Sequence, residues 1–418
     1  MKTKNAVYAQ SGGVTSVINA TACGVIEASR KSKKIDKLFA GKDGIVGILN
    51  EDLIDTSIEK SSEIKKLMHT PGGAFGSCRH KLKDPKKSQK EFKRLIEVFQ
   101  AHDIGYFFYN GGGDSQDTSN KIAQYTKEAG FPVTCIGIPK TIDNDLPFTD
   151  NCPGFGSVAK YIATSTKEAA LDVKSMSKSS TKIFILEVMG RHAGWLAASA
   201  GLAKSSNNSA PHIILLPEVP FNEKSFLKKV KEVVKKEDYC VIVVSEGAQY
   251  KNGKFLADAG TVDSFGHKQL GGVAPRVAEL ISSKLGLKYH WAVSDYLQRS
   301  ARHISSQVDL DQAYAVGKAA VEFASKGENA IMPTIVRKKS KPYSWDIGKV
   351  ELSKVANIEK KMPQKFISKD GFGITQSCKN YLLPLIQGEA WAPFKDGVID
   401  TASLKNKLTK KKLKSFKI

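Results

Sequence analysis

The chain has 418 residues, of which 41% are hydrophobic, and a formal net charge of +22. This length allows two or three domains with large cores, and the composition is ordinary for a globular protein. The charge would attract polyanions, including phosphorylated metabolites. Zinc-finger spacing and the aromatic motifs of RNA-binding domains are absent, so no nucleic-acid partner is expected.

The six cysteines are far apart and form no C-x-x-C pair, which argues against a disulfide framework and a zinc site. The N-terminus has no signal-peptide core, and no apolar run approaches the ~20 residues that span a bilayer. We therefore expect reduced thiols, a cytoplasmic location and no membrane partner.

An alternation of short buried strands and helices begins near the N-terminus. Residues 6–9 predict a strand, and the Gly-rich turn 10–20 (QSGGVTSVINA) leads into a helix. Glycines here let backbone N–H groups approach a phosphate at the positive end of the helix, with a simple tight turn as the alternative. A second strand is predicted at 37–40, and a loop around 44–49.

A second Gly-rich loop lies at 71–82 (PGGAFGSCRHKL) and carries Arg79. The guanidinium has a fixed fork of donors that suits a phosphate, although an ordinary surface loop is a fair rival. The overlapping segment 81–94 mixes both signs of charge and predicts a solvent-exposed face.

A third Gly-rich turn, 110–123 (NGGGDSQDTSNKIA), follows a predicted helix at 89–101 and a strand at 105–109. Several such turns on a β/α alternation are far less expected by chance than one. Asp114 in this turn is unusual for a phosphate cradle, because a carboxylate repels phosphate unless a metal intervenes or repulsion is the purpose.

The densest polar cluster follows the strand predicted at 133–138, which Pro139 ends. Open α/β sheets bind their ligands at the carboxyl ends of strands. One carboxylate here could take a proton while another holds a metal, with a simple Asx turn as the alternative. The cluster consists of Lys140, Thr141, Asp143, Asn144 and Asp145.

The alternation continues with a helix and three strands predicted at 156–173, 182–188, 212–216 and 239–244. Arg191 follows a glycine at a strand end, a position suited to clamping a substrate oxygen or phosphate. Glu246 could bind sugar hydroxyls or simply be a charge at a helix N-terminus. Trp195 is expected to pack in a helix.

The remaining sequence is less informative. Segment 292–302 offers Tyr296 and Arg299, and 327–418 is more polar and carries no chemical motif. The last fourteen residues, from Lys405, hold seven lysines and no acid and predict a solvated tail.

Six motifs together resemble the 6-phosphofructokinase family. In chain order they are QSGGVTSVINA, GGGDS, PKTIDND, MGRHAGW, SEGA and YLQR, spread over residues 10–299. The resemblance implies an α/β fold with two Rossmann-like, three-layer α/β/α domains. Residues 1–150, joined by part of 300–418, would form the phosphoryl-donor domain, 151–300 the fructose 6-phosphate domain, and 327–418 a family-variable segment with a basic tail.

The detail within the motifs resembles the pyrophosphate-dependent members. ATP-dependent members usually have glycine where this chain has Asp114 and Lys140. Lys140 can place a positive charge at the transferred phosphoryl group, and Asp114 would fill the space and carry the charge of the ATP α-phosphate, which excludes ATP. Fructose 6-phosphate and pyrophosphate would then give fructose 1,6-bisphosphate and phosphate, reversibly and with Mg²⁺, in glycolysis and gluconeogenesis. Strong allosteric control is not expected.

The resemblance also implies residue roles. Asp143 would be the general base, with Lys140, Asp114 and Thr141 beside it in catalysis. Donor contacts would come from Gly13, Arg79, Asp114 and Lys140, and metal contacts from Asp114, Asp145 and the Gly113 position. The sugar phosphate would contact Thr141, Ile142, Asp143, Lys182, Met189, Gly190, Arg191, Glu246, Tyr296, Leu297, Gln298 and Arg299.

Lys182 stands where the family has a basic residue that reaches the adjacent subunit's site, which implies a homodimer or homotetramer. Two residues depart from the pattern: Gly113 where many relatives have Asp or Asn, and His290 where arginine is common. Two alternatives stay open, an ATP-dependent phosphofructokinase and a non-catalytic regulatory subunit of the same fold.

Overall fold

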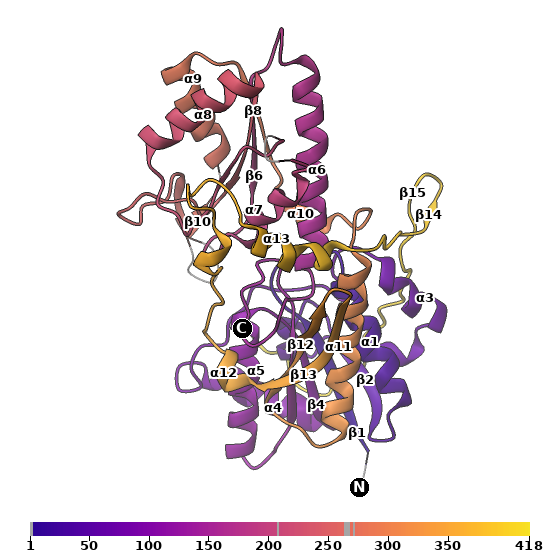
Figure 1. The fold of residues 1–418 in the computed structure, drawn as a ribbon. Helices are drawn as coiled ribbons and strands as arrows, with labels where there is room; N and C mark the ends of the chain where they lie inside the picture. The colour runs from indigo at the N-terminus through magenta and orange to yellow at the C-terminus, as the bar shows by residue number, and fades with distance from the viewer. Residues whose placement is uncertain (1–2, 207–208, 263–267, 271) are drawn as a thin grey trace. The chain divides into compact units, whose positions relative to one another are not determined.

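The computed structural model describes residues 3–206, 209–262, 268–270 and 272–418. The chain forms two compact units (Figure 1). The first contains Met1–Gly154, Gln307–Glu359 and Glu389–Ile418, and the second contains Phe155–Ser306 and Lys360–Gly388. Within the late segment, 327–359 and 389–418 belong to the first unit and 360–388 to the second.

The first unit is built on a seven-stranded sheet in the order β13-β12-β5-β4-β1-β2-β3. The five inner strands are parallel, and β3 and β13 run antiparallel at the two edges. The strands are β1 (Lys4–Gln10), β2 (Ile35–Gly41), β3 (Leu53–Asp55), β4 (Ile104–Gly111), β5 (Thr134–Pro139), β12 (Ile331–Ser340) and β13 (Tyr343–Glu351).

Helices cover both faces of this sheet. Alternate side chains of β1 point to opposite faces and therefore join two different cores. Ala6 and Tyr8 join the core beneath α1 (Ile18–Lys31) and α11 (Gln307–Ser325). Val7 and Ala9 join the opposite core beneath α4 (Gln89–Ala101) and α5 (Gly113–Glu128). The unit is thus a three-layer α/β/α domain.

Two glycines bring α1 and α11 into close contact. A Cβ on Gly24 would lie 2.3 Å from the carbonyl oxygen of Tyr314, and one on Gly317 would lie 2.2 Å from that of Thr21. Any larger residue would push the helices apart. This packing attaches the late segment 307–359 to the N-terminal half of the unit.

The second unit has a four-stranded parallel sheet in the order β11-β6-β8-β7. One face packs on α8 and α9, and the other packs on α6. The strands are β6 (Ile183–Val188), β7 (Ile213–Leu215), β8 (Cys240–Ser245) and β11 (Tyr289–Val293), and the helices are α6 (Phe155–Met176), α7 (Trp195–Ser199), α8 (Glu223–Glu237), α9 (Val273–Leu285), α10 (Asp295–Ser300) and α13 (Gln376–Leu382).

Most sequence-predicted elements are confirmed, and Trp195 is buried among aromatic rings at the start of α7, as expected. The loop predicted around 44–49 is wrong, because Ile45–Leu49 forms the short helix α2 with buried apolar side chains. The remaining elements are α3 (Ser61–Lys66), α12 (Leu352–Val355), and the short strands β9 (Asp258–Val262), β10 (Lys268–Leu270), β14 (Phe394–Lys395) and β15 (Val398–Ile399).

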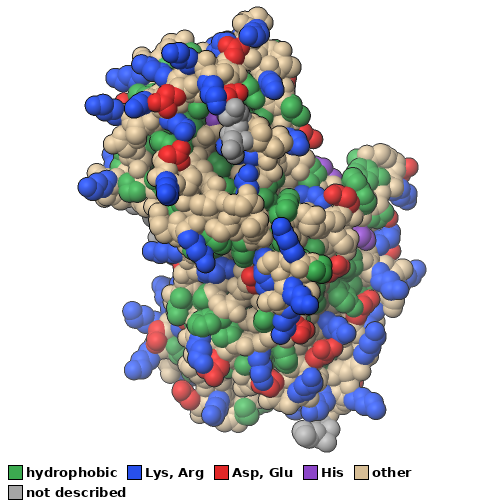
Figure 2. All heavy atoms as spheres, viewed as in Figure 1, with side chains coloured by type: hydrophobic (Ala, Val, Ile, Leu, Met, Phe, Trp, Pro, Cys, Tyr) green, Lys and Arg blue, Asp and Glu red, His purple; other side chains and the backbone are tan. Residues whose placement is uncertain are grey.

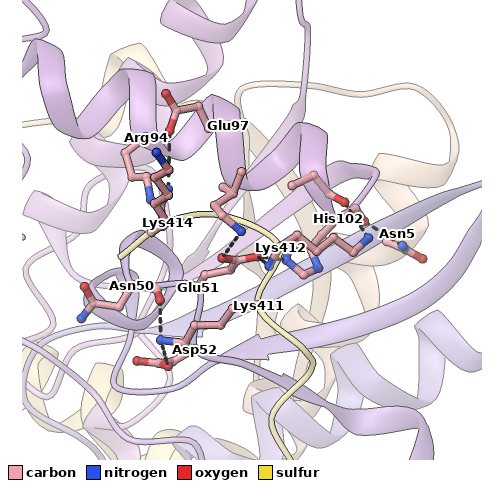
Figure 3. A network of polar contacts seen from close by, with 12 residues as sticks. Asn5, Asn50, Glu51, Asp52, Arg94, Glu97, His102, Lys411, Lys412 and Lys414 are labelled. Carbon is pink, nitrogen blue, oxygen red and sulfur yellow. Dashed lines mark hydrogen bonds and ion pairs between the residues drawn. The ribbon is translucent and has the colours of Figure 1, made fainter. Parts of the chain in front are cut away.

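The seven lysines of the C-terminal tail are exposed, as predicted for a solvated tail, but its backbone is not free. The tail runs along the edge strand β3, where Thr409 N–H donates to the Leu53 carbonyl and Asp55 N–H to that of Lys407. Beyond this pairing, the buried carboxylate of Glu51 accepts hydrogen bonds from the N–H groups of Lys412 and Leu413 (Figure 3). The tail thereby covers a sheet edge that would otherwise present unpaired backbone groups.

Three general observations bear on the sequence-based exclusions. In the described part of the chain, every helix is too short or too polar to cross a bilayer. Lys and Arg side chains are spread over the visible face of both units, rather than gathered in one stripe (Figure 2). All six cysteines are free thiols.

Candidate active site

In the first unit, the three polar turns singled out by the sequence follow neighbouring strands. Strands β5, β4 and β1 are adjacent and parallel, so their carboxyl ends lie at one edge of the sheet. The Gln116 side chain donates to the carbonyls of Gly111 and Ile138 and so ties the ends of β4 and β5 together. The sheet therefore presents Gly-rich backbone and charged side chains side by side.

The turn after β1 is in direct contact with Lys140. Lys140 is only 5% exposed, and its ammonium donates to the carbonyl oxygen of Gly13 at 2.7 Å. Gly12 has φ +74°, which favours glycine, and a Cβ there would lie 3.4 Å from Lys140 Nζ. Gly12 N–H also donates to the Cys78 carbonyl, and Ser77 Oγ donates to the Gly12 carbonyl. Two Gly-rich turns thus meet beside a buried positive charge.

Asp114 lies in the first turn of α5 and forms an ion pair with Lys81. The distance from Lys81 Nζ to Asp114 Oδ1 is 2.5 Å, and both side chains are about one-third exposed. The positive charge offsets the repulsion that a lone carboxylate would exert on a nearby phosphate. Lys81 was therefore missed by the sequence reasoning, which placed it on a solvent-exposed face.

The segment after β5 is held by its own polar groups. Asp143 N–H donates to Thr141 Oγ1 at 3.1 Å, and Cys152 N–H donates to the Asn144 side chain. Asn144 adopts φ +54°, which fixes a sharp turn between the two aspartates. Asp143 and Asp145 are both half-buried, whereas Ile142 is buried.

In the second unit, the segment Met189–Arg191 follows β6 and is held in place by three side chains. Met189 N–H donates to Gln298 Oε1, and Gly190 N–H donates to Glu246 Oε1 at 3.2 Å. Ser245 Oγ donates to the Gly190 carbonyl at 2.5 Å. The structure therefore brings together four of the residues that the sequence proposed for the sugar phosphate.

The chain passes very close to itself at this turn. Gly190 has φ +120°, and a Cβ on Gly247 would lie 2.0 Å from the carbonyl oxygen of Arg191. Glycine is therefore required at both positions. Glu218, which the sequence reasoning also missed, accepts a hydrogen bond from Gly194 N–H at 2.8 Å and holds the other end of the turn.

Burial raises the pKa of the Glu246 carboxyl above its ordinary value, and the charges of Glu187 and Asp295 add to this effect. The hydrogen bond from Gly190 and the positive charge of Arg191 act in the opposite direction. A carboxyl balanced in this way can accept hydrogen bonds from hydroxyl groups when it is ionised.

Helix α10 carries the remaining sugar-phosphate candidates. Gln298 is buried, while Tyr296 and Leu297 are 60% and 65% exposed. The Arg299 guanidinium lies 3.7 Å from the centre of the Tyr296 ring, a cation–π contact. An arginine and a tyrosine hydroxyl are therefore presented together on an accessible helix.

The structure also places four other residues that the sequence analysis singled out. Lys182 lies at the amino end of β6 and pairs with Asp238 at 2.7 Å, away from the carboxyl ends of the strands. Arg79 is exposed on its loop, and His290 is exposed on β11. A Cβ on Gly113 would have no neighbour within 4 Å, so the fold itself does not demand glycine there.

Parallel strands that end in glycine-rich turns, a buried lysine and paired aspartates define an α/β phosphate-binding protein of the kind that performs phosphoryl transfer. A sequence model described as phosphofructokinase matches residues 5–324. The chain belongs to the phosphofructokinase family.

Individual relatives resemble the chain over its full length. It is 58% identical over 419 residues to the pyrophosphate–fructose 6-phosphate 1-phosphotransferase of Halomonas elongata, with 100% of both proteins covered. It is 57% identical over 414 residues to the enzyme of the same name from Methylococcus capsulatus, with 99% of each covered.

A solved structure carries the comparison to the fold. The crystal structure of a pyrophosphate-dependent phosphofructokinase from Marinobacter aquaeolei has a TM-score of 0.92 and 60% sequence identity, and covers 99% of this chain and 100% of that one. The α/β class predicted from the sequence is therefore confirmed, together with the family.

Proposed function

We propose that the protein transfers a phosphoryl group from pyrophosphate to the 1-hydroxyl of fructose 6-phosphate, giving fructose 1,6-bisphosphate and phosphate in glycolysis. Full-length identity of 57–58% to two enzymes of that name supports the assignment. The observation that carries it in the structure is the buried Lys140, whose ammonium donates to the carbonyl of Gly13 in the first Gly-rich turn.

The first unit supplies the groups for the donor. Backbone N–H groups of the turn that contains Gly13 bind pyrophosphate oxygens, and Lys140 stabilises the negative charge that develops during transfer. Asp114, held by its ion pair with Lys81, occupies the space of an ATP α-phosphate and excludes it by steric clash. Arg79 lies on the adjoining loop and binds the outer phosphate.

The second unit supplies the groups for the acceptor. Met189, Gly190 and Arg191 bind the sugar phosphate, Glu246 accepts hydrogen bonds from its hydroxyls, and Arg299 binds its 6-phosphate. Tyr296, Leu297 and Gln298 on α10 complete the contacts that this unit provides.

Asp143 is the general base. It takes the proton of the 1-hydroxyl as that oxygen bonds to the phosphorus, the bridging P–O bond breaks, and phosphate leaves. Its half-buried position and its backbone contact with Thr141 hold the carboxylate at the end of β5. In the reverse direction, the protonated carboxyl returns this proton to the departing sugar oxygen.

Mg²⁺ fits the carboxylates present. Among the described residues there is no cluster of three or more His, Cys, Asp or Glu side chains that would form an all-protein metal cage. Mg²⁺ commonly takes one or two carboxylates together with substrate phosphates, a demand that Asp143, Asp145 and Asp114 can meet. When bound, the ion neutralises charge on the pyrophosphate oxygens. Gly113 offers no side chain for it.

We further propose a cytoplasmic homodimer or homotetramer. Six free cysteines are consistent with a reducing compartment. Lys182 lies at the opposite end of β6 from the other sugar-phosphate residues and would bind substrate in the site of an adjacent subunit. Within its own subunit it forms an ion pair with Asp238.

The donor assignment is tested with the double variant Asp114→Gly, Lys140→Gly. Turnover with pyrophosphate should fall by roughly 100-fold or more, because a preorganised charge at the transferred group is removed, while turnover with ATP should appear or rise. The control Asp117→Asn breaks an ion pair with Lys121 on the same helix and should leave the donor preference unchanged. Wild-type turnover with ATP alone would overturn the proposal, and no turnover with either donor would favour a non-catalytic subunit.

A further inference from the structure

A cavity lies within the second unit, away from the carboxyl ends of β6 and β8. It has a volume of about 420 Å³ and is formed by the edge strand β7, the C-terminal half of α8 and the segment 368–379. Cavities of roughly 300–1,000 Å³ accommodate small organic ligands. His212 and Ile214 line it at the start of β7, whereas the sugar-phosphate residues follow the carboxyl ends of β6 and β8.

Three half-buried lysines face this cavity: Lys204, Lys229 and Lys379. Lys229 pairs with Asp370 at 3.0 Å. The ammonium groups of Lys204 and Lys379 make no hydrogen bond or ion pair with residues in the described ranges. Partly buried ammonium groups are costly unless an anion or acceptor compensates them.

The one carboxylate near the three lysines is already engaged. Asp370 accepts hydrogen bonds from Ser368 Oγ and Phe372 N–H in addition to its ion pair with Lys229. Of the other lining acids, Glu232 is exposed and Glu237 pairs with Lys236 on α8. Positive charge is therefore in excess at the inner end of the cavity.

The electrostatic effect of this excess appears at Lys204. Burial lowers the pKa of its ammonium below the ordinary value, and repulsion from Lys379 and Lys229 lowers it further, against a smaller opposite effect of Asp370. A bound dianion would offset this repulsion and raise the pKa of Lys204 again.

One wall of the cavity is apolar and tied to the edge of the sheet. Ile214, Phe372 and Ile374 contribute side chains. Ile214 N–H donates to the Phe372 carbonyl, and Ile367 and Ile374 pair across the loop, so the wall is fixed to the edge of the sheet. A ligand that combines a dianionic head with a small organic body matches both parts of the cavity.

We propose that this cavity binds a small phosphomonoester, with its phosphate on Lys204, Lys229 and Lys379 and its organic part against Ile214 and Phe372. The site is separate from the one proposed for fructose 6-phosphate and does not depend on that assignment.

The test is calorimetric titration of the full-length protein with phenyl phosphate. Each titration is also made in a Lys140→Gln, Arg299→Gln background, which weakens the proposed catalytic site, so that phenyl phosphate bound there is told apart from phenyl phosphate bound in the cavity. No other phosphate compound is present, because it would compete for the cavity. We expect the double variant Lys204→Gln, Lys379→Gln to bind phenyl phosphate at least tenfold more weakly than the wild type. The control double variant Lys228→Gln, Lys235→Gln changes two exposed lysines of α8 that do not line the cavity. It should bind phenyl phosphate as the wild type does.

Thermal denaturation keeps the test independent of folding defects. Removing two like charges should leave the melting temperature of the Lys204→Gln, Lys379→Gln variant equal to or above that of the wild type, and phenyl phosphate should raise the melting temperature only of the wild type and the control. Absence of wild-type binding, or an equal loss in both double variants, would overturn the proposal. Inorganic phosphate binding as tightly as phenyl phosphate would overturn the role of the apolar wall.

Discussion

Replacing Glu51 with glutamine should release the C-terminal tail from the first unit. The Glu51 side chain is 0% exposed and accepts hydrogen bonds from Lys412 N–H at 2.5 Å, Leu413 N–H at 3.0 Å and His102 Nε2 at 2.6 Å (Figure 3). A glutamine amide keeps one acceptor oxygen but turns N–H donors toward groups that are themselves donors. At least one buried donor is then left without an acceptor.

The size of the effect follows from these contacts. Hydrogen bonds to a charged group contribute about 1.5–3 kcal/mol each. Losing one or two of them should cost roughly 2–4 kcal/mol in the free energy of tail detachment, a change of roughly 30- to 700-fold in the detached population. The ion pair between Lys411 and Asp52 is more exposed and contributes at most about 1 kcal/mol.

Limited trypsin digestion measures this population, because the tail carries seven lysines from Lys405 onward. When detachment is fast relative to cleavage, the cleavage rate follows the equilibrium population of the detached tail. Mass spectrometry should show Glu51→Gln losing the tail at least 30-fold faster than wild type, as estimated above, while the matched control Asp52→Asn changes by no more than about fivefold. Equal cleavage of the two variants would refute the role assigned to Glu51.

Three further predictions concern the tail contact of Glu51, the proposed pyrophosphate site and the proposed fructose 6-phosphate site. Burial alone would raise the pKa of Glu51, but its hydrogen bonds lower the pKa below the ordinary 4.5. The contribution of Glu51 to stability should therefore be complete above about pH 5.5 and be lost as the pH falls through the lowered pKa. Urea denaturation across pH 3–7 measures this dependence, which Glu51→Gln should lack. Gly12→Ala should raise KM for pyrophosphate about tenfold, because the new methyl group would contact Lys140 Nζ at 3.4 Å and take up space beside its charge. The control Gly130→Ala has a similar φ of +73° and no neighbour within 4 Å, so it should share the backbone strain and leave KM unchanged. The raised pKa of Glu246 predicts that KM for fructose 6-phosphate increases as the pH falls through that pKa. Glu246→Gln should remove this increase at acidic pH. An increase that persists in the variant would come from the titration of another group.

The parts of the fold that were predictable are those whose signals are local. Short β-branched runs, Gly-rich turns and the proline after β5 each act within a few residues, so the parallel strands and the polar turns at their ends could be read from the sequence. The tail could not, because its partners Glu51 and Leu53 lie more than 350 positions earlier in the chain. Its lysines suggest solvation, yet the attachment uses backbone groups as well as side chains.

Contacts between residues far apart in the sequence also could not be predicted at the site. Lys140 and Asp114 were recognisable from their motifs, whereas the pairing of Asp114 with Lys81 depends on how a separate loop folds back on α5. Lys81 directly follows the Arg79–His80 pair of a Gly-rich loop, and that position was the available signal. Glu218 gave no local signal, because its role is a single contact with Gly194.

The central claim is that pyrophosphate is the phosphoryl donor and that Asp143 is the base. The most direct test measures fructose 1,6-bisphosphate formation from fructose 6-phosphate, Mg²⁺ and either pyrophosphate or ATP, in the wild type and in Asp143→Ser. The account predicts wild-type turnover with pyrophosphate only, and a loss of roughly 100-fold or more in kcat in the variant with little change in either KM. Undiminished turnover in Asp143→Ser, or wild-type turnover with ATP in place of pyrophosphate, would contradict it.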